Sequence, residues 1–403
     1  MRWRLLLVLA ACGAGAGVVV CLVATTRGGC SSAPLGSLPP TVAHPAGESA
    51  PGGGRGQEGG LLVFRGGPAA AVLAASLVPA HTRLTGASDN GACVLVSVPG
   101  TDDTPLRTLV AGTSEEGPWV AEVDGVQAAV SSDGCLVASI SADSTRTTLA
   151  VYEVGDGARV WARSVPADRL CWGLAFSPDS RSLAVDCLSD EDGRRRLDLY
   201  DARDGTPLGS MTDGPAPSRP VSRAAWTADG AALVFHDGER LYRGNVGLWS
   251  VSVLRDLPPA SVEEGREPLH LRPSSDGATW VCRRPKPERG RSSGPSTWVL
   301  QVVNVSGRAY EPRAFRRSGP TSEPQWFGDR IVALCAALSG GPYMDLVWAR
   351  PDDEALTRVL SGVQSFACGD HAIAVAHRPS GGSEVALAIV APDASVHEWM
   401  RRR

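Results

Sequence analysis

The sequence predicts an all-β fold built from one repeated unit of four short antiparallel strands. The stretch "WGLAFSPDSRSLAVDC", Trp172 to Cys187, has an apolar strand on each side of a Ser-Pro-Asp turn, a tripeptide typical of tight turns. Related turns recur along the chain at a nearly constant interval. A second strand–turn–strand segment, such as "RLDLYDARDGTPLGS", follows the turns at a similar distance. Two hairpins per interval give a four-stranded unit.

The period of the repeat predicts how these units are arranged. Steps of 44, 46, 50, 47, 53 and 41 residues separate the turn aspartates, which are Asp89, Asp133, Asp179, Asp229, Asp276, Asp329 and Asp370. This is the period of β-propeller blades, so we predict seven four-stranded blades within residues 61–403. Six or eight blades stay open, because the segment after Asp229 has a poor second turn. We expect "LLVF", Leu61–Phe64, to close the ring on the last blade, with surface packing as the alternative.

An apolar segment opens the chain. Arg2 and Arg4 precede Leu5–Thr26, a run of 22 residues without charge, which is long enough to cross a bilayer as a helix. The positive-inside rule places the N-terminus in the cytoplasm and the rest outside. Residues 1–30 are therefore predicted to be an uncleaved signal anchor. Two alternatives stay open: a lipoprotein signal in which "LAAC" is the lipobox and Cys12 is acylated, and a plain cleaved signal peptide.

Residues 31–60 consist largely of Pro, Gly, Ser and Ala, with few large apolar side chains. Such a composition does not bury enough surface to offset the entropy cost of ordering, which predicts a disordered linker. As a flexible coil, about 30 residues hold the folded part roughly 30 Å from the membrane on average. The predicted location is thus the cytoplasmic membrane, with the propeller on the extracytoplasmic side.

The blade around Asp179 carries a family resemblance. "LAFSPDSRSLAV" followed by "LDLYDARDGT" resembles the WD-repeat-like and TolB-like propellers of bacterial envelopes. This sequence departs from true WD repeats in two ways: no Gly-His pair precedes the strands, and Tyr200-Asp201 stands where the Trp-Asp pair would be. The resemblance implies a rigid disc that binds other macromolecules, usually without catalysis.

Seven cysteines follow residue 30. An odd number in an oxidising compartment cannot all pair within one chain. Five of them fall on or beside the second strand of a blade, where we expect small buried side chains; these are Cys93, Cys135, Cys187, Cys282 and Cys335. A disulfide between Cys282 and Cys335 is the minor alternative.

Catalytic and metal motifs are missing from the sequence. It contains no C-x-x-C, no H-E-x-x-H and no Walker-type phosphate loop. We therefore predict no catalytic residues, no metal and no cofactor. The net charge of −4 and pI of about 6.0 argue against nucleic acid as a partner.

One basic segment is a candidate binding surface. "RRPKPERGRSSGPS", residues 283–296, connects two predicted strands and is longer than a hairpin needs. Its cations would suit anionic headgroups, wall polymers or an acidic protein; they are Arg283, Arg284, Lys286, Arg289 and Arg291. A solvated loop is the alternative.

Together these features favour a membrane-tethered, non-catalytic scaffold that binds a protein or another ligand in the cell envelope. The expected partners are envelope proteins or a cell-wall polymer, with the cytoplasmic membrane held through the N-terminal segment. The alternatives are a sensor module of an envelope signalling system and a propeller-fold glycan hydrolase or lyase. An enzyme would need carboxylates or a histidine converging from different blades on the central axis.

Overall fold

The described part of the chain consists of strands and turns. The computed structural model describes residues 6–8, 19–21, 62–65, 83–98, 107–114, 117–123, 125, 127–142, 146–155, 157–166, 169–189, 193–212, 224–237, 240–256, 272–274, 279–285, 298–304, 322, 324–336, 343–351, 353, 356–369, 371–378 and 385–401. Within these ranges the secondary structure is all-β, and no helix is long and apolar enough to cross a membrane.

Little of the N-terminal segment is described. β1 (Leu6–Val8) and β2 (Val19–Cys21) pair as an antiparallel ribbon. The other residues of the predicted anchor, including Cys12, and the whole predicted linker lie outside the described residues. The anchor and the linker therefore stay predictions.

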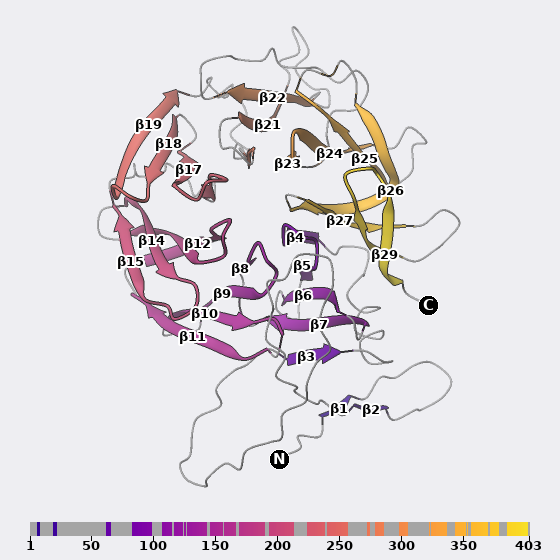
Figure 1. The fold of residues 1–403 in the computed structure, drawn as a ribbon, viewed down its shortest axis with the longest axis horizontal. Helices are drawn as coiled ribbons and strands as arrows, with labels where there is room; N and C mark the ends of the chain where they lie inside the picture. The colour runs from indigo at the N-terminus through magenta and orange to yellow at the C-terminus, as the bar shows by residue number, and fades with distance from the viewer. Residues whose placement is uncertain are drawn as a thin grey trace, which may run out of the picture.

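The remaining strands form antiparallel sheets arranged around a central axis, as in a β-propeller (Figure 1). The first sheet has the order β3-β7-β6-β5-β4, with β3 (Leu62–Arg65), β4 (Arg83–Ala87), β5 (Cys93–Val98), β6 (Arg107–Ser114) and β7 (Gly117–Val123). The second contains β8 (Gln127–Val130), β9 (Leu136–Ala142), β10 (Thr147–Glu153) and β11 (Arg159–Val165). The third contains β12 (Arg169–Phe176), β13 (Ser182–Ser189), β14 (Arg195–Asp201) and β15 (Pro207–Met211).

The later sheets continue the pattern. The fourth contains β16 (Ala225–Trp226), β17 (Ala232–His236), β18 (Arg240–Asn245) and β19 (Ser250–Asp256). The fifth has three described strands, β20 (Arg272–Pro273), β21 (Thr279–Pro285) and β22 (Trp298–Asn304). The last has seven, β23 (Gln325–Phe327), β24 (Arg330–Ala336), β25 (Met344–Ala349), β26 (Thr357–Cys368), β27 (Ile373–His377), β28 (Ala386–Val390) and β29 (Val396–Arg401).

Strand β26 belongs to two antiparallel meanders. Its beginning pairs with β25, and its end pairs with β27. Gly362 lies between the two parts with a φ of 81°, and a Cβ at this position would lie 2.6 Å from the carbonyl oxygen of Arg378. Only glycine fits this bend without displacing the backbone.

Antiparallel pairing gives the disc two distinct faces. The turn after each innermost strand and the turn between the third and fourth strands lie at the same end of a sheet, which we call the turn face. The opposite end, where the second strand connects to the third, is the loop face. The first strand of the described disc, β3, begins at the loop face, because Leu62 pairs with Glu122 near the end of β7.

This placement of β3 corrects the sequence prediction. Residues 62–65 do not join the last blade; they pair with β7 as the outer strand of the first sheet. The closure on the last blade was inferred by analogy with other propellers, and nothing in a four-residue apolar strand selects one outer edge over another.

The predicted turns are built by one local device. In the second, third and fourth sheets, a Ser or Thr hydroxyl donates a hydrogen bond of 2.6 Å to the Asp two residues later. Oδ1 of that Asp also accepts a hydrogen bond from the backbone N–H two residues further along the chain. The first turn places Asn90 in the Asp position, with Ser88 donating to its Oδ1 at 2.7 Å. The repeat in the first blade therefore runs through Asn90, one residue beyond the predicted Asp89. Asp276 and Asp370 lie outside the described residues.

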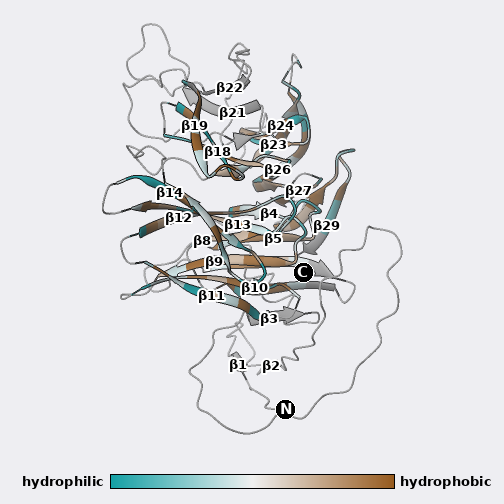
Figure 2. Ribbon diagram, turned by 60° about the vertical axis from the view of Figure 1, so that its left-hand side comes forward, coloured by the Kyte–Doolittle hydropathy of each residue, from teal (hydrophilic) through white to brown (hydrophobic). Residues whose placement is uncertain are grey.

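The core lies between neighbouring sheets. In β13, Leu183, Val185 and Cys187 face the second sheet, and Ala184 packs with the fourth. Both sides of the inner strands are therefore buried and rich in hydrophobic residues, whereas the outer strand β11 is largely exposed (Figure 2). Small residues allow the close spacing that this arrangement needs.

Candidate functional site

The described start of the predicted basic segment lies at the loop face. Arg283 and Arg284 lie near the end of β21, where they pair in register with Leu300 and Val299 of β22. Lys286, Arg289 and Arg291 lie in the connection from β21 to β22, outside the described residues. The segment keeps its predicted place between two strands, and its role as a binding surface stays a prediction.

A disulfide in the third sheet corrects the cysteine prediction. Cys171 of β12 and Cys187 of β13 are register partners and form a disulfide, so Cys187 is not a simple buried thiol. Cys335 is a thiol, which excludes the alternative pair with Cys282. Sequence spacing did not reveal this bond, because the register of β12 shifts at a bulge between Cys171 and Gly173.

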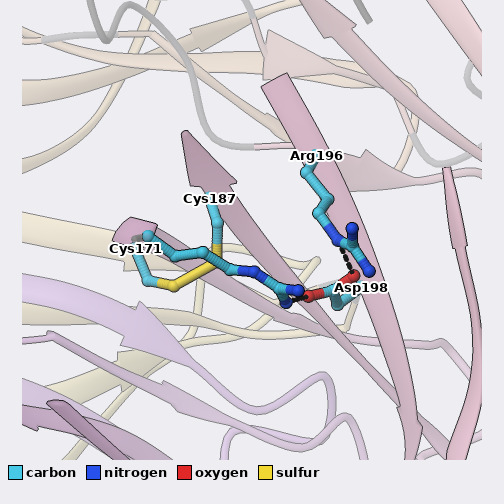
Figure 3. A network of polar contacts seen from close by, with 5 residues as sticks. Cys171, Cys187, Arg196 and Asp198 are labelled. Atoms are coloured by element: carbon cyan, nitrogen blue, oxygen red, sulfur yellow. Dashed lines mark hydrogen bonds and ion pairs between the residues drawn. A yellow bond between two sulfur atoms is a disulfide. The ribbon is translucent and has the colours of Figure 1, made fainter. Parts of the chain in front are cut away.

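Three charged side chains lie beside this disulfide (Figure 3). Asp198 of β14 accepts a hydrogen bond from Arg196 at 2.7 Å and one from Arg169 of β12 at 2.5 Å. Asp198 is 7% exposed, whereas Arg196 is 32% exposed. Two guanidinium groups thus share one carboxylate, and the cluster joins β12 to β14 across the loop-face end of the sheet.

A buried ion pair lies on the opposite side of the same sheet. Arg195 binds Asp186 through both Nε and Nη2, and their side chains are 2% and 3% exposed. The guanidinium also donates to the carbonyl of His236 at 3.1 Å and lies over the ring of Phe235, both in the fourth sheet. Asp186 accepts the backbone N–H of Ala224 at 3.0 Å. The pair therefore ties the third sheet to the fourth.

A cavity lies on the central axis and opens at the turn face. Its volume is about 330 Å³, and its wall is formed by residues of the innermost strands β4, β8, β12, β16, β23 and β26, with Ser274 following β20. Most lining side chains are small or apolar, among them Ala87, Ala129, Leu174 and Trp226. Within the described lining, Asp89 supplies the one carboxylate, and there is no histidine.

The recurring turns form the rim of the cavity. The residue between the Ser or Thr and its Asp or Asn partner faces the mouth; in four consecutive turns this residue is Asp89, Ser132, Pro178 and Ala228. The turns bond to one another, because Asp89 N donates to Ser132 O at 3.0 Å and Asp133 N donates to Ser180 Oγ at 3.2 Å. These bonds link the first three of the four turns to one another.

Two of the turn carboxylates, Asp179 and Asp229, have lowered pKa values. The hydroxyl of Thr227 lowers the pKa of Asp229, helped by the backbone N–H of Ala231. At Asp179, burial acts to raise the pKa, but the hydroxyl of Ser177 and the backbone N–H of Arg181 outweigh it, so that pKa is also lowered. Hydrogen bonds to the charged form account for both shifts.

Metal chemistry has no support among the residues described here. No group of three or more His, Cys, Asp or Glu side chains in this part of the chain is placed to hold a metal ion.

The axial cavity was not predicted from the sequence, because its wall combines residues from strands that are far apart along the chain. The local signal was the pairs of small residues before the turns, such as Ala128-Ala129 and Ala224-Ala225.

No family model matches this sequence, and no curated protein matches it. Among solved structures, the β-propeller domain of the trilobed protease from Pyrococcus furiosus is similar, with a TM-score of 0.53 and 12% identity over 79% of this chain and 95% of that chain. Acylaminoacyl peptidase bound to Z-Gly-Gly-Phe-chloromethyl ketone has a TM-score of 0.53 and 11% identity, over 79% of this chain and 52% of that chain. Acylaminoacyl peptidase from Pyrococcus horikoshii has a TM-score of 0.50 and 12% identity, with the same coverage.

At such low identity these similarities show the fold alone. The chain is thus a β-propeller protein, as the repeat predicted, and its membership of the TolB-like family stays a prediction. The chain spans about half the length of the acylaminoacyl peptidases.

Proposed function

We propose that the chain is a membrane-tethered propeller that binds a partner in the cell envelope without catalysing a reaction. The observation that carries this proposal is the chemistry of the axial cavity. A hydrolase or lyase that works by acid–base catalysis needs at least two groups that can take up or release a proton at one substrate bond. The described lining offers one carboxylate, from Asp89, among small, apolar and uncharged polar side chains. Such a wall suits binding better than proton transfer.

We further propose that the ring has seven blades. Five of them correspond to the first five sheets, and the seven-stranded sheet supplies the last two through the shared strand β26. The fifth sheet has three described strands, and its fourth strand would come from the residues between β22 and β23.

One observation supports an extracytoplasmic position, and a second bears on the orientation of the disc. The Cys171–Cys187 disulfide is a bond that persists in oxidising compartments and is rare in the cytoplasm. The disc begins with β3 at the loop face, so the predicted linker and anchor would join it there. The turn face, with its cavity, would then point away from the membrane toward envelope proteins or the wall.

In-cell crosslinking of the C-terminally tagged full chain, followed by mass spectrometry, tests the proposal. The expected result is one or a few reproducible envelope partners. Two variants locate the contact: Ser132→Trp with Ala228→Trp blocks the mouth, and Arg283→Gln, Arg284→Gln, Lys286→Gln, Arg289→Gln and Arg291→Gln neutralise the loop-face segment. Loss of the partner in only one of them identifies the surface.

Protease added to intact spheroplasts tests the location. The tagged propeller should be digested, and a cytoplasmic control protein should remain intact. Full protection of the propeller would overturn the proposed topology. Correct export without any captured protein would turn the proposal toward a glycan or a small ligand and reopen the case for a hydrolase or lyase.

A further inference from the structure

The wall of the axial cavity offers backbone groups as well as apolar side chains. Strands β4, β8, β12, β16 and β20 are each the terminal strand of a sheet, so one edge of each has no neighbouring strand within that sheet. One backbone carbonyl on such an edge, that of Ala175 in β12, already accepts a hydrogen bond of 3.0 Å from Trp226 Nε1. Strand edges of this kind pair with the backbone of extended peptides.

The size of the cavity limits what it accepts. Its volume of about 330 Å³ is near the lower end of ligand pockets, which run from about 300 to 1,000 Å³. A folded domain does not fit, whereas a chain end or a loop can insert one or two apolar side chains. The small residues of the wall, such as Ala87 and Ala225, provide the room.

The charge around the mouth selects the sign of the ligand. Asp133, Asp179 and Asp229 are exposed at the rim of three consecutive blades, and each is held in place through Oδ1 by a Ser or Thr hydroxyl. Arg181 is the exposed cation of these three turns, and the half-buried Arg243 of β18 acts on Asp229. Asp329, on the far side of the ring, is already paired with Arg350 at 2.8 Å. The mouth is therefore negative on the side of the second to fourth sheets.

We propose that the axial cavity binds a cationic polypeptide segment, whose apolar side chain enters the cavity while its Lys or Arg neighbours lie on the rim aspartates. The proposal rests on the proposed binding function and names the class of partner. Complementary charge around a pocket gives both orientation and specificity. Long-range attraction also raises the association rate at low salt.

The test uses the full chain in detergent and two labelled hexapeptides, Lys-Leu-Lys-Leu-Lys-Leu and Glu-Leu-Glu-Leu-Glu-Leu, with binding measured by fluorescence anisotropy. The key variant is Asp179→Asn with Asp229→Asn. Asparagine keeps the Oδ1 acceptor, and the first turn already uses Asn90 in this way, with hydrogen bonds of 2.7 and 2.9 Å. The variant therefore removes charge while the turn is kept.

Two further variants separate charge from cavity. Asp204→Asn with Asp256→Asn removes the same number of charges from an outer turn and from the loop face, away from the axis. Ser132→Trp with Ala228→Trp fills the mouth of the cavity. The equivalent position in the four turns is occupied by Asp, Ser, Pro and Ala, so the turn accepts different side chains there and folding should be preserved. Circular dichroism of each variant verifies that the fold is intact.

We expect the wild type to bind the lysine peptide and not the glutamate peptide, with affinity falling as NaCl rises from 50 to 500 mM. The rim variant should bind at least about fivefold more weakly, the outer-turn control should bind like the wild type, and the blocked variant should not bind. Equal affinity for both peptides, or unchanged affinity in the rim variant, would overturn the proposal. A partner still captured in cells by the rim variant would refute this ligand class and leave the binding function standing.

Discussion

Removing Asp186 should destabilise the protein strongly, because it leaves a buried guanidinium without its counter-charge. Arg195 is 2% exposed and binds Asp186 through two nitrogens. After Asp186→Ala its described polar partner is the carbonyl of His236, at 3.1 Å. The backbone N–H of Ala224 also loses its acceptor. Breaking a buried pair from one side costs about 3–5 kcal/mol.

Urea unfolding followed by intrinsic tryptophan fluorescence measures the effect. With a slope of roughly 3 kcal/mol per M, the midpoint should fall by about 1–1.7 M. Asp256→Ala is the matched control, because the Arg240–Asp256 pair is exposed and should contribute little. The double change Asp186→Leu with Arg195→Met should recover much of the loss, since an apolar pair of similar volume replaces a buried ion pair well. A midpoint for Asp186→Ala equal to that of the control would refute the reasoning.

Three further predictions follow from local contacts. Replacing both Cys171 and Cys187 by alanine should cost about 3 kcal/mol, because the bond closes 16 residues of sequence, and dithiothreitol should lower the urea midpoint of the wild type but not of this variant. Gly205 and Gly193 both have positive φ, so replacing either by Ala should cost about 1–2 kcal/mol. Gly205→Ala should destabilise the protein further, because its methyl group would lie 2.7 Å from the Trp161 ring, whereas the methyl group of Gly193→Ala meets nothing within 4 Å. Equal thermal midpoints for the two variants would contradict this. The pKa of Asp229 is lowered, so its contribution to stability is present above the ordinary aspartate pKa of 3.8 and is lost as pH falls through the folded pKa. Asp229→Asn should therefore flatten the acid side of the curve of stability against pH relative to the wild type.

The sequence was informative where structure is local. The Ser177-Pro178-Asp179 turn and the Asp204-Gly205 turn appear as expected, because each is held by bonds between residues only a few positions apart. The same locality explains the shift in the first blade. Asp89 and Asn90 are adjacent, either could cap the turn, and only the position of Ser88 relative to the cap selects Asn90.

Features that join distant segments were not predictable from one sequence. The Cys171–Cys187 bond depends on a register shift that no pattern in the sequence marks. The axial cavity requires strands from the start and the end of the disc to meet, as Thr85 and Cys368 do in its wall. The basic segment of residues 283–296 was visible because it is continuous, but continuity alone does not identify a binding surface.

The position of β3 has a mechanical consequence for a tethered disc. The described ring closes between the first and the last sheets without exchanging a strand, because apolar residues of both sheets share one core. Two hydrogen bonds also join these sheets. Leu84 N donates to Ser365 Oγ at 3.3 Å, and His371 N donates to Asp89 O at 3.0 Å. A pull on the N-terminal segment would act first on β3, which is held by pairing with β7 at the outer edge. Because the closing contacts lie elsewhere, β3 could peel from the edge while the ring and its axial cavity stay intact. A variant lacking residues 61–65 should therefore keep the peptide binding of the full chain, whereas a strand that closed the ring would take the cavity with it.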